Sequence, residues 1–170
     1  MFREVRNNAI KCLLPDTIRQ DVSIDIGFGD VITPQPSVLD YPNLLEGFPD
    51  TNIMAYSLET IVAEKFQTVI SRAEANSRMK DFYDLYTILQ GDKYNAGILY
   101  DAIKATFENR QTTYQENHVV FTPEFAENSD MGIRWNAFMK KLKAPVQLTF
   151  PEVTSYLQAQ LKPYWERLKQ

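Results

Sequence analysis

Two neighbouring amphipathic helices are predicted by residues 57–90, which read SLETIVAEKFQTVISRAEANSRMKDFYDLYTILQ. Ser57 is a suitable N-cap for the first helix, which should run to about Arg72. Ser77 is the expected cap of the second helix, over residues 78–89. Apolar side chains recur at helical spacing in both segments, so each helix should bury one face.

One lysine interrupts the apolar pattern of the first helix. At about 100° per residue, Lys65 falls about 20° from Leu58 and about 40° from Val69, near the middle of the apolar face. Burying an ammonium there is costly unless an anion meets it. Two partners are open on the sequence alone. One is a structural ion pair with a carboxylate of the next helix, such as Asp81, and the other is an exchangeable anion such as a nucleotide phosphate.

Charged residues crowd the connection between the two helices. Asp81 sits at the border of the apolar stripe of the second helix, whereas Asp84 is expected to face solvent. Such a density of charged residues at a helix N-terminus suits anion binding. It suits salt bridges that join the two helices equally well. The charged set consists of Arg72, Arg78, Lys80, Asp81 and Asp84.

A strand is predicted near the N-terminus, because apolar and polar residues alternate over residues 20–27. Asp25 should face away from the packed side of this strand and precedes a Gly-rich turn, so its carboxylate serves either turn chemistry or a functional site. Four prolines follow between residues 31 and 50. They predict an extended, irregular connection with only a short strand at 31–33.

The C-terminal half reads as helical. Further helices are predicted at about 98–107, at about 123–142 with a break near Gly132, and at about 151–168 with an interruption or bend at Pro163. The fold class is therefore α+β. We expect residues 1–55 to form a strand-containing segment with a Pro-rich connection, and residues 56–170 to form a helical domain.

Composition narrows the class of protein. With 170 residues, of which 44% are hydrophobic, the chain can bury one core without a disulfide or a metal. Cys12 is the single cysteine, which suits a reducing cytoplasm and argues against a structural zinc site. His118 is the single histidine and is expected to be a surface or loop residue. No stretch is apolar for long enough to predict a membrane span.

Charge is unevenly distributed along the chain. The formal net charge is −4, yet residues 132–170 hold seven Lys or Arg residues and two Glu residues. This basic tail permits contact with a phosphate backbone, although the solvated faces of ordinary helices explain it as well.

Three blocks occur in an order that is typical of a known family. Residues 24–30 read IDIGFGD, residues 63–66 read AEKF, and residues 77–86 read SRMKDFYDLY. Together they resemble the nucleotidyltransferases of the AbiEii/AbiGii toxin family of type IV toxin–antitoxin systems. The downstream residues 106–112 and the helix around Trp135 are similar to the helical region of that family.

The resemblance implies a polymerase-beta-like nucleotidyltransferase fold, a nucleoside triphosphate substrate with Mg²⁺, and a cognate antitoxin. Some members of the family transfer the nucleotide onto tRNA. Lys65 matches the lysine that holds the triphosphate, and Arg78 and Asp84 are further candidates for binding the nucleotide. Asp81 matches the aspartate of the last motif. Asp25 matches the strand carboxylate that binds metal or accepts the proton of the attacking hydroxyl.

The chain departs from the family pattern at its start. A Gly-Ser turn followed by an Asp-x-Asp pair should precede the Asp25 strand, and residues 1–21 do not contain it. We therefore expect a fragment or a truncated gene product that binds Mg²⁺ weakly and turns over poorly. Two alternatives stay open: a non-catalytic helical module that binds an antitoxin or another protein, and an RNA-binding helical domain that uses the basic tail.

Overall fold

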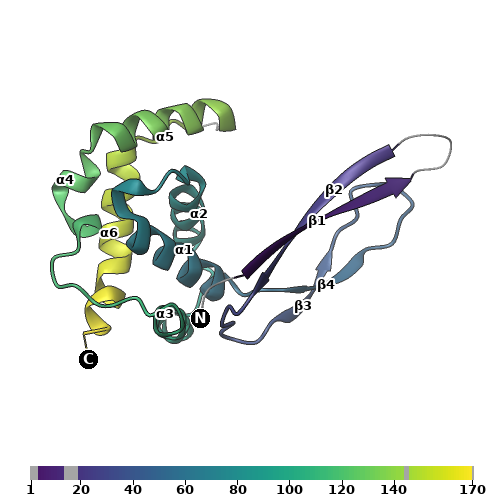
Figure 1. The fold of residues 1–170 in the computed structure, drawn as a ribbon, viewed down its shortest axis with the longest axis horizontal. Helices are drawn as coiled ribbons and strands as arrows, with labels where there is room; N and C mark the ends of the chain where they lie inside the picture. The colour runs from purple at the N-terminus through teal and green to yellow at the C-terminus, as the bar shows by residue number, and fades with distance from the viewer. Residues whose placement is uncertain (1–3, 14–18, 144–145, 170) are drawn as a thin grey trace. The chain divides into compact units, whose positions relative to one another are not determined.

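The computed structural model of the chain describes residues 4–13, 19–143 and 146–169. It contains two compact units, of which the first ends at Val31 and the second begins at Ile32. Strands occupy the N-terminal part and helices the remainder (Figure 1), so the predicted α+β class is confirmed.

The first unit is an antiparallel hairpin. Strand β1 (Glu4–Leu13) pairs with β2 (Arg19–Phe28), so that Glu4 lies opposite Phe28 and Leu13 opposite Arg19. The alternating residues therefore do form a strand. However, its apolar side chains Val22, Ile24 and Ile26 are 40–41% exposed. The expected packed side of the strand is thus not covered within the part of the chain that the structure describes.

A second hairpin follows where the sequence predicted an irregular connection. Strand β3 (Ser37–Tyr41) pairs antiparallel with β4 (Thr51–Ala55). The prediction of a short strand at 31–33 was wrong. Pro36 directly precedes β3 and Pro42 directly follows it, so neither proline removes a backbone donor from inside the ladder. The prolines mark the ends of the strand and do not prevent it.

Thr33 instead forms two hydrogen bonds with the first helix. Its backbone N–H donates to Thr60 Oγ1 over 3.2 Å, and the Thr60 hydroxyl donates to the Thr33 carbonyl over 2.7 Å. Both backbone groups of Thr33 are therefore used by a side chain rather than by a neighbouring strand.

Helices make up the rest of the second unit. The bounds of the long ones are α1 Leu58–Arg72, α2 Met79–Gln90, α3 Ala96–Asn109, α5 Ser129–Leu142 and α6 Phe150–Arg167. Short helical turns are η1 (Ala73–Ala75), η2 (Val119–Phe121) and α4 (Pro123–Ala126). None of the helices in the described residues is both long and apolar enough to cross a membrane.

The observed helix ends confirm one of the two predicted N-caps and correct the other. Ser57 caps α1 as expected, through a hydrogen bond from the Thr60 N–H to its hydroxyl. Ser77 is not the cap of α2, because the N-cap position belongs to Arg78, whose side chain makes no capping bond. The Asn76 side chain takes over part of that role by accepting the Arg78 N–H at 2.9 Å.

The C-terminal helices break at a different residue from the one predicted. Asn128 separates α4 from α5 and caps α5 by accepting the Met131 N–H at 3.1 Å. Gly132, the expected breaking point, lies inside α5. Helix α6 begins in a capping box formed by Thr149 and Glu152 and continues through Pro163.

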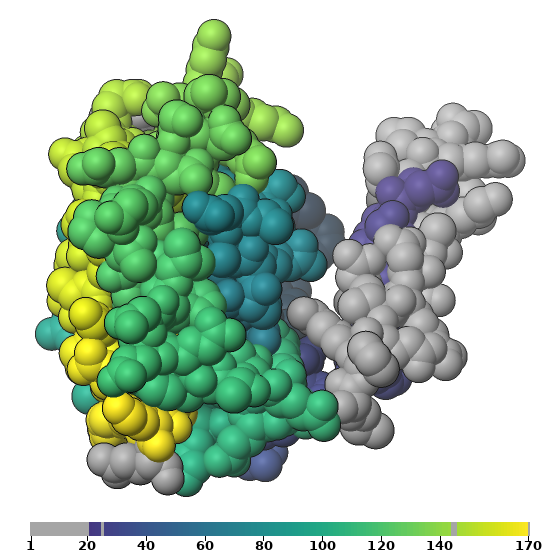
Figure 2. Space-filling view, turned by 60° about the vertical axis from the view of Figure 1, so that its left-hand side comes forward, coloured from purple at the N-terminus to yellow at the C-terminus, as the bar shows by residue number. Residues whose placement is uncertain are grey.

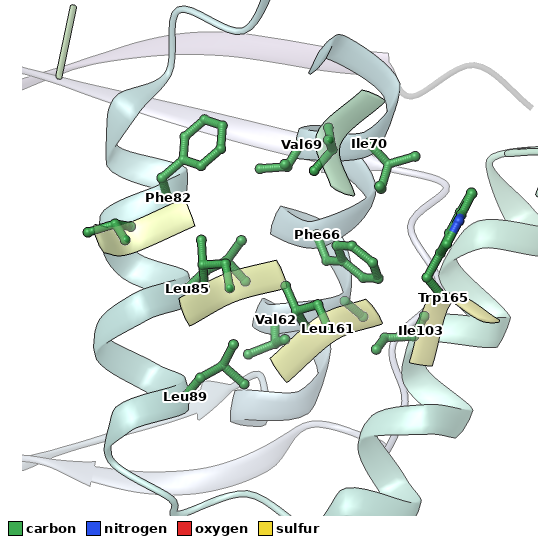
Figure 3. Close-up of a cluster of buried hydrophobic side chains, with 14 of the residues drawn as sticks. Val62, Phe66, Val69, Ile70, Phe82, Leu85, Leu89, Ile103, Leu161 and Trp165 are labelled. Carbon is green, nitrogen blue, oxygen red and sulfur yellow. The ribbon is translucent and has the colours of Figure 1, made fainter. Parts of the chain in front are cut away.

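One apolar core joins α1, α2, α3 and α6. Figure 3 shows side chains from these helices converging, with Phe66 of α1, Leu85 of α2, Ile103 of α3 and Leu161 of α6 among them. All four are 3% exposed or less, and each contributes roughly 2 kcal/mol by leaving water. Because α1 and α2 share this core, the charged edges of the two helices are brought together.

Both tryptophans belong to this core. Trp135 and Trp165 are almost fully buried, and Figure 2 shows α6, in yellow, alongside the green segments that follow α3. His118 was expected to be a surface or loop residue; it does lie in the loop before η2, but it is not at the surface. It is 8% exposed, its ring lies 5.6 Å from that of Trp165, and its Nδ1 accepts the Val120 N–H.

Candidate functional site

Lys65 meets two carboxylates of the neighbouring helix. Its ammonium lies 2.9 Å from Asp81 Oδ1 and 2.7 Å from Asp84 Oδ2. Lys65 comes from α1, and both aspartates come from the first two turns of α2. Lys65 thus forms one charged cluster with two aspartates that follow it in the sequence by 16 and 19 positions.

Two expectations about the placement of these residues need correction. Lys65 was placed near the middle of the apolar face, but the buried side of α1 is centred on Phe66 and Ile70. Lys65 lies at the border of that side, with 20% of its side chain exposed. Asp84 was expected to face solvent, yet its side chain is also only 20% exposed. The packing of α1 against α2 covers both edges.

Within the cluster, Lys65 and Asp84 are both held in their charged forms. Burial alone would lower the pKa of Lys65, but hydrogen bonds to Asp84 and Asp81 outweigh it, so this pKa lies above its ordinary value. Burial would raise the pKa of Asp84, but hydrogen bonds from Lys65 and Lys80 hold that pKa below its ordinary value. The ammonium and the carboxylate are therefore both charged at neutral pH.

Asp81 is the most buried member of the cluster. Its side chain is 8% exposed, and its Oδ2 atom is buried and accepts no hydrogen bond within the described residues. Arg78 Nε lies 3.7 Å from that oxygen. Lys65 is thus the principal partner that offsets the cost of burying this carboxylate.

Two further cations stand at the rim of the cluster. Lys80 lies 2.6 Å from Asp84 Oδ2, and the side chains of Lys80 and Arg78 are 72% and 60% exposed. Together with Lys65 these are three cations against two carboxylates, which leaves one formal positive charge at the N-terminal end of α2. Arg72, the other cation predicted at this corner, is exposed in the last turn of α1.

A second polar cluster lies on another side of α1. Arg110 donates to Gln67 Oε1 at 2.8 Å and lies 3.8 Å from Glu64 Oε2, while Gln67 Nε2 donates to Thr112 Oγ1 at 2.8 Å. Sequence reasoning did not assign these residues to a site. The only available signal was that Arg110 and Thr112 fall in the block at 106–112, since nothing in their spacing points to Gln67.

The described residues contain no group of three or more His, Cys, Asp or Glu side chains able to hold a metal ion. Asp81 and Asp84 bind an ammonium instead, so this pair does not suit Mg²⁺ by itself. Asp25 was predicted as a metal ligand. Its backbone pairs with Asn7 in the first hairpin, but its side chain lies outside the described residues, and its role stays a prediction.

This arrangement is chemically suited to bind an anion. An ammonium has three donors, and the two carboxylates use two of the three Lys65 donors. The third donor and the two exposed cations are available to phosphate oxygens, for which such charge-assisted hydrogen bonds are strong.

Comparison with known proteins identifies the family of the chain. No curated protein matches the sequence. The family model described as "Nucleotidyl transferase AbiEii toxin, Type IV TA system" matches residues 3–160. The match spans most of the chain, including α1, α2 and the cluster between them. The chain therefore belongs to the AbiEii family of nucleotidyl transferase toxins from type IV toxin–antitoxin systems.

Proposed function

We propose that the Lys65 cluster binds the phosphates of a nucleoside triphosphate for nucleotidyl transfer. The observation that carries this proposal is the half-buried Lys65 ammonium, which is charged, fixed by two carboxylates, and retains one donor. Fixing the ammonium before the ligand arrives reduces the entropic cost of binding. The positive excess at the corner favours a polyphosphate over a neutral ligand.

In this reaction an acceptor hydroxyl attacks the α-phosphorus of the triphosphate. A new phosphorus–oxygen bond forms to the acceptor, the bond to the bridging oxygen breaks, and pyrophosphate leaves with the electron pair. Negative charge grows on the leaving group, and a nearby cation stabilises it. Lys65 has this role in the proposal, with Arg78 and Lys80 at its rim, while Asp81 and Asp84 position the ammonium.

Mg²⁺, an RNA acceptor such as tRNA, and an antitoxin protein are what we infer from the family. Asp25 is the proposed carboxylate for metal binding or for accepting the proton of the attacking hydroxyl. The strands of residues 1–55 would then belong to the nucleotidyltransferase domain, with residues 56–170 as the helical domain.

Nucleotide titration tests the proposal. The 170-residue chain would be titrated with each of the four nucleoside triphosphates, with binding followed by calorimetry and by the shift in Tm. Lys80→Ala is the informative variant, because its exposed side chain can be removed without disturbing the core. We expect several-fold weaker triphosphate binding for Lys80→Ala and complete loss for Lys65→Ala.

Lys93→Ala provides the matched control. It removes the same charge from the exposed turn after α2, at the opposite end of that helix, and should bind triphosphate like the wild type. Equal affinity in the wild type and in the Lys65 and Lys80 variants would refute the proposal. So would the absence of triphosphate binding to a folded wild-type chain.

A non-catalytic interaction module is the second candidate. The observation in its favour is that Lys65 already has two carboxylate partners and so needs no ligand. On this account Lys65→Ala lowers stability, and no nucleoside triphosphate changes the Tm of the wild type. The same titration therefore decides between the two functions.

A further inference from the structure

A hollow lies in the surface of the helical unit, away from the Lys65 cluster. Its volume is about 540 Å³, and it is bounded by the C-terminal half of α3, the segment after it, and the end of α6. This volume falls within the range that holds a small organic ligand. The side chains that matter most to its chemistry are Tyr100, Lys104, Tyr114 and Arg167.

Arg167 lies over an aromatic ring at one wall of this hollow. Its guanidinium carbon lies 3.6 Å from the ring centroid of Tyr100. The Tyr100 hydroxyl donates to the Arg167 carbonyl over 3.5 Å, which joins the two residues a second time. No carboxylate forms an ion pair with Arg167 among residues 4–13, 19–143 and 146–169. Its donors and its outer face therefore remain available.

A second aromatic side chain is fixed beside it. The rings of Tyr114 and Trp165 lie 5.1 Å apart, and the Trp165 indole donates to the Gln115 carbonyl over 3.0 Å. Trp165 is almost fully buried, so it anchors the segment that carries Tyr114. The hollow thus has one aromatic side chain, Tyr114, that packs against the core, and a second, Tyr100, that lies under Arg167.

The lining also holds an ammonium, a carboxylate and hydroxyl groups. Lys104 lies 3.9 Å from Glu108, but both side chains are more than half exposed, so this contact restrains the ammonium weakly. Thr112 and Thr113 also line the hollow. Aromatic faces, a stacked guanidinium, a loosely paired ammonium and hydroxyls together match a flat base that carries a phosphate.

We propose that this hollow binds an unpaired nucleotide. The base stacks on the outer face of Arg167 or on Tyr114, and the phosphate is held by Lys104 and the Arg167 donors. Lys65 contacts α2, whereas the hollow is formed by α3 and α6, so this is a second site and does not depend on the proposed triphosphate site. The bound nucleotide belongs either to a single strand of RNA or to a free mononucleotide, and binding measurements distinguish these sources.

The test uses the 170-residue chain without nucleoside triphosphate. A fluorescently labelled single-stranded RNA of about eight nucleotides would be titrated by anisotropy, with a duplex of the same sequence for comparison. We expect the single strand to bind more tightly. Arg167→Ala should weaken binding of the single strand about 10-fold. Arg167→Lys, which keeps the charge but loses the planar guanidinium, should weaken this binding nearly as much.

Two further variants locate the site. Tyr100→Leu removes the ring under Arg167 and should weaken binding like Arg167→Ala. Lys141→Ala is the matched control, because it removes an exposed positive charge from α5 and should change affinity less than about 2-fold. Each variant would first be shown by circular dichroism and its Tm to be folded.

The outcomes are distinct. Competition by adenosine or uridine monophosphate at equal affinity would assign the hollow to a free nucleotide, and competition by the RNA strand alone would assign it to a strand. Either result supports the proposal, provided that Arg167→Ala weakens binding of that ligand about 10-fold. Equal losses in Arg167→Ala and Lys141→Ala would indicate diffuse charge attraction and overturn the proposal, as would the failure of both probes to bind.

Discussion

Lys65 and Asp84 form the shorter of the two ion pairs that the Lys65 ammonium makes, at 2.7 Å, whereas the sequence offered Asp81 as the example of a carboxylate partner. Because Asp84 also accepts from Lys80 at 2.6 Å, this carboxylate connects a half-buried cation to an exposed one. The cluster is therefore a short chain of charges that runs from the edge of the core to solvent.

Removing Lys65 should destabilise the helical unit. Lys65→Ala leaves the buried Asp81 carboxylate without its principal partner, and we expect the free energy of unfolding to fall by about 2 kcal/mol, between the values typical of exposed and of fully buried pairs. Urea unfolding at pH 7 measures this loss. Lys80→Ala is the control and should cost less than about 0.5 kcal/mol. Equal losses for the two variants would contradict the structural role assigned to Lys65.

The ion pair of Lys65 with Asp84 should make stability depend on pH at both extremes. The pKa of Asp84 is lowered in the folded state, so its contribution is present above about pH 4, the unfolded value, and is lost as the pH falls through the folded pKa. The pKa of Lys65 is raised, so its contribution is present below about pH 10 and is lost as the pH rises through the folded pKa. Asp84→Asn should flatten the acid limb when unfolding is measured from pH 2 to pH 7. An unchanged acid limb would count against the pair.

His118 should add a separate loss of stability in mild acid. Burial lowers its pKa, and a hydrogen bond to the Ile70 backbone only partly opposes this. The neutral form is thus favoured in the folded state, so the contribution of His118 is present above about pH 6.5 and is lost as the pH falls toward the folded pKa. His118→Asn, which can still cap η2, should remove this dependence. Because the chain has a single histidine, its proton NMR resonance reports the pKa directly, and a value above 6.5 would refute the prediction.

Gln111 should be replaceable by glycine with a gain in stability. Its φ is +51°, in the left-handed region that glycine adopts readily, at the residue after the C-cap of α3. We expect Gln111→Gly to raise the free energy of unfolding by up to about 1 kcal/mol. Asp101→Gly, inside the same helix and exposed, should lower it by about 1 kcal/mol. Thermal unfolding of both variants measures these two changes. A lower free energy of unfolding for Gln111→Gly than for the wild type would show that the Gln111 side chain stabilises the turn.

Local sequence patterns correctly predicted the elements whose structure depends on residues that are close together in the chain. The helical period of residues 57–72, the Ser57 cap and the alternation of residues 20–27 each led to the element that forms. The hairpin of residues 37–55 was missed because four prolines were interpreted as breaking the strands, whereas the two that adjoin β3 lie just outside it. The burial of His118 was missed because a lone histidine carries no signal of the indole ring that covers it.

The candidate site likewise has features that the sequence indicated and features that only the structure showed. The sequence by itself determined the family and singled out Lys65 and Asp81 as candidates, because the blocks around these two residues are contiguous and resemble those of the AbiEii family. Only the tertiary structure decided that Asp84 joins Lys65, that Lys65 lies at the border of the core, and that Tyr100 meets Arg167. Helical spacing determines which side chains share a face, but the angle at which α1 packs on α2, and α3 on α6, is set by the shapes of buried side chains far apart in the chain.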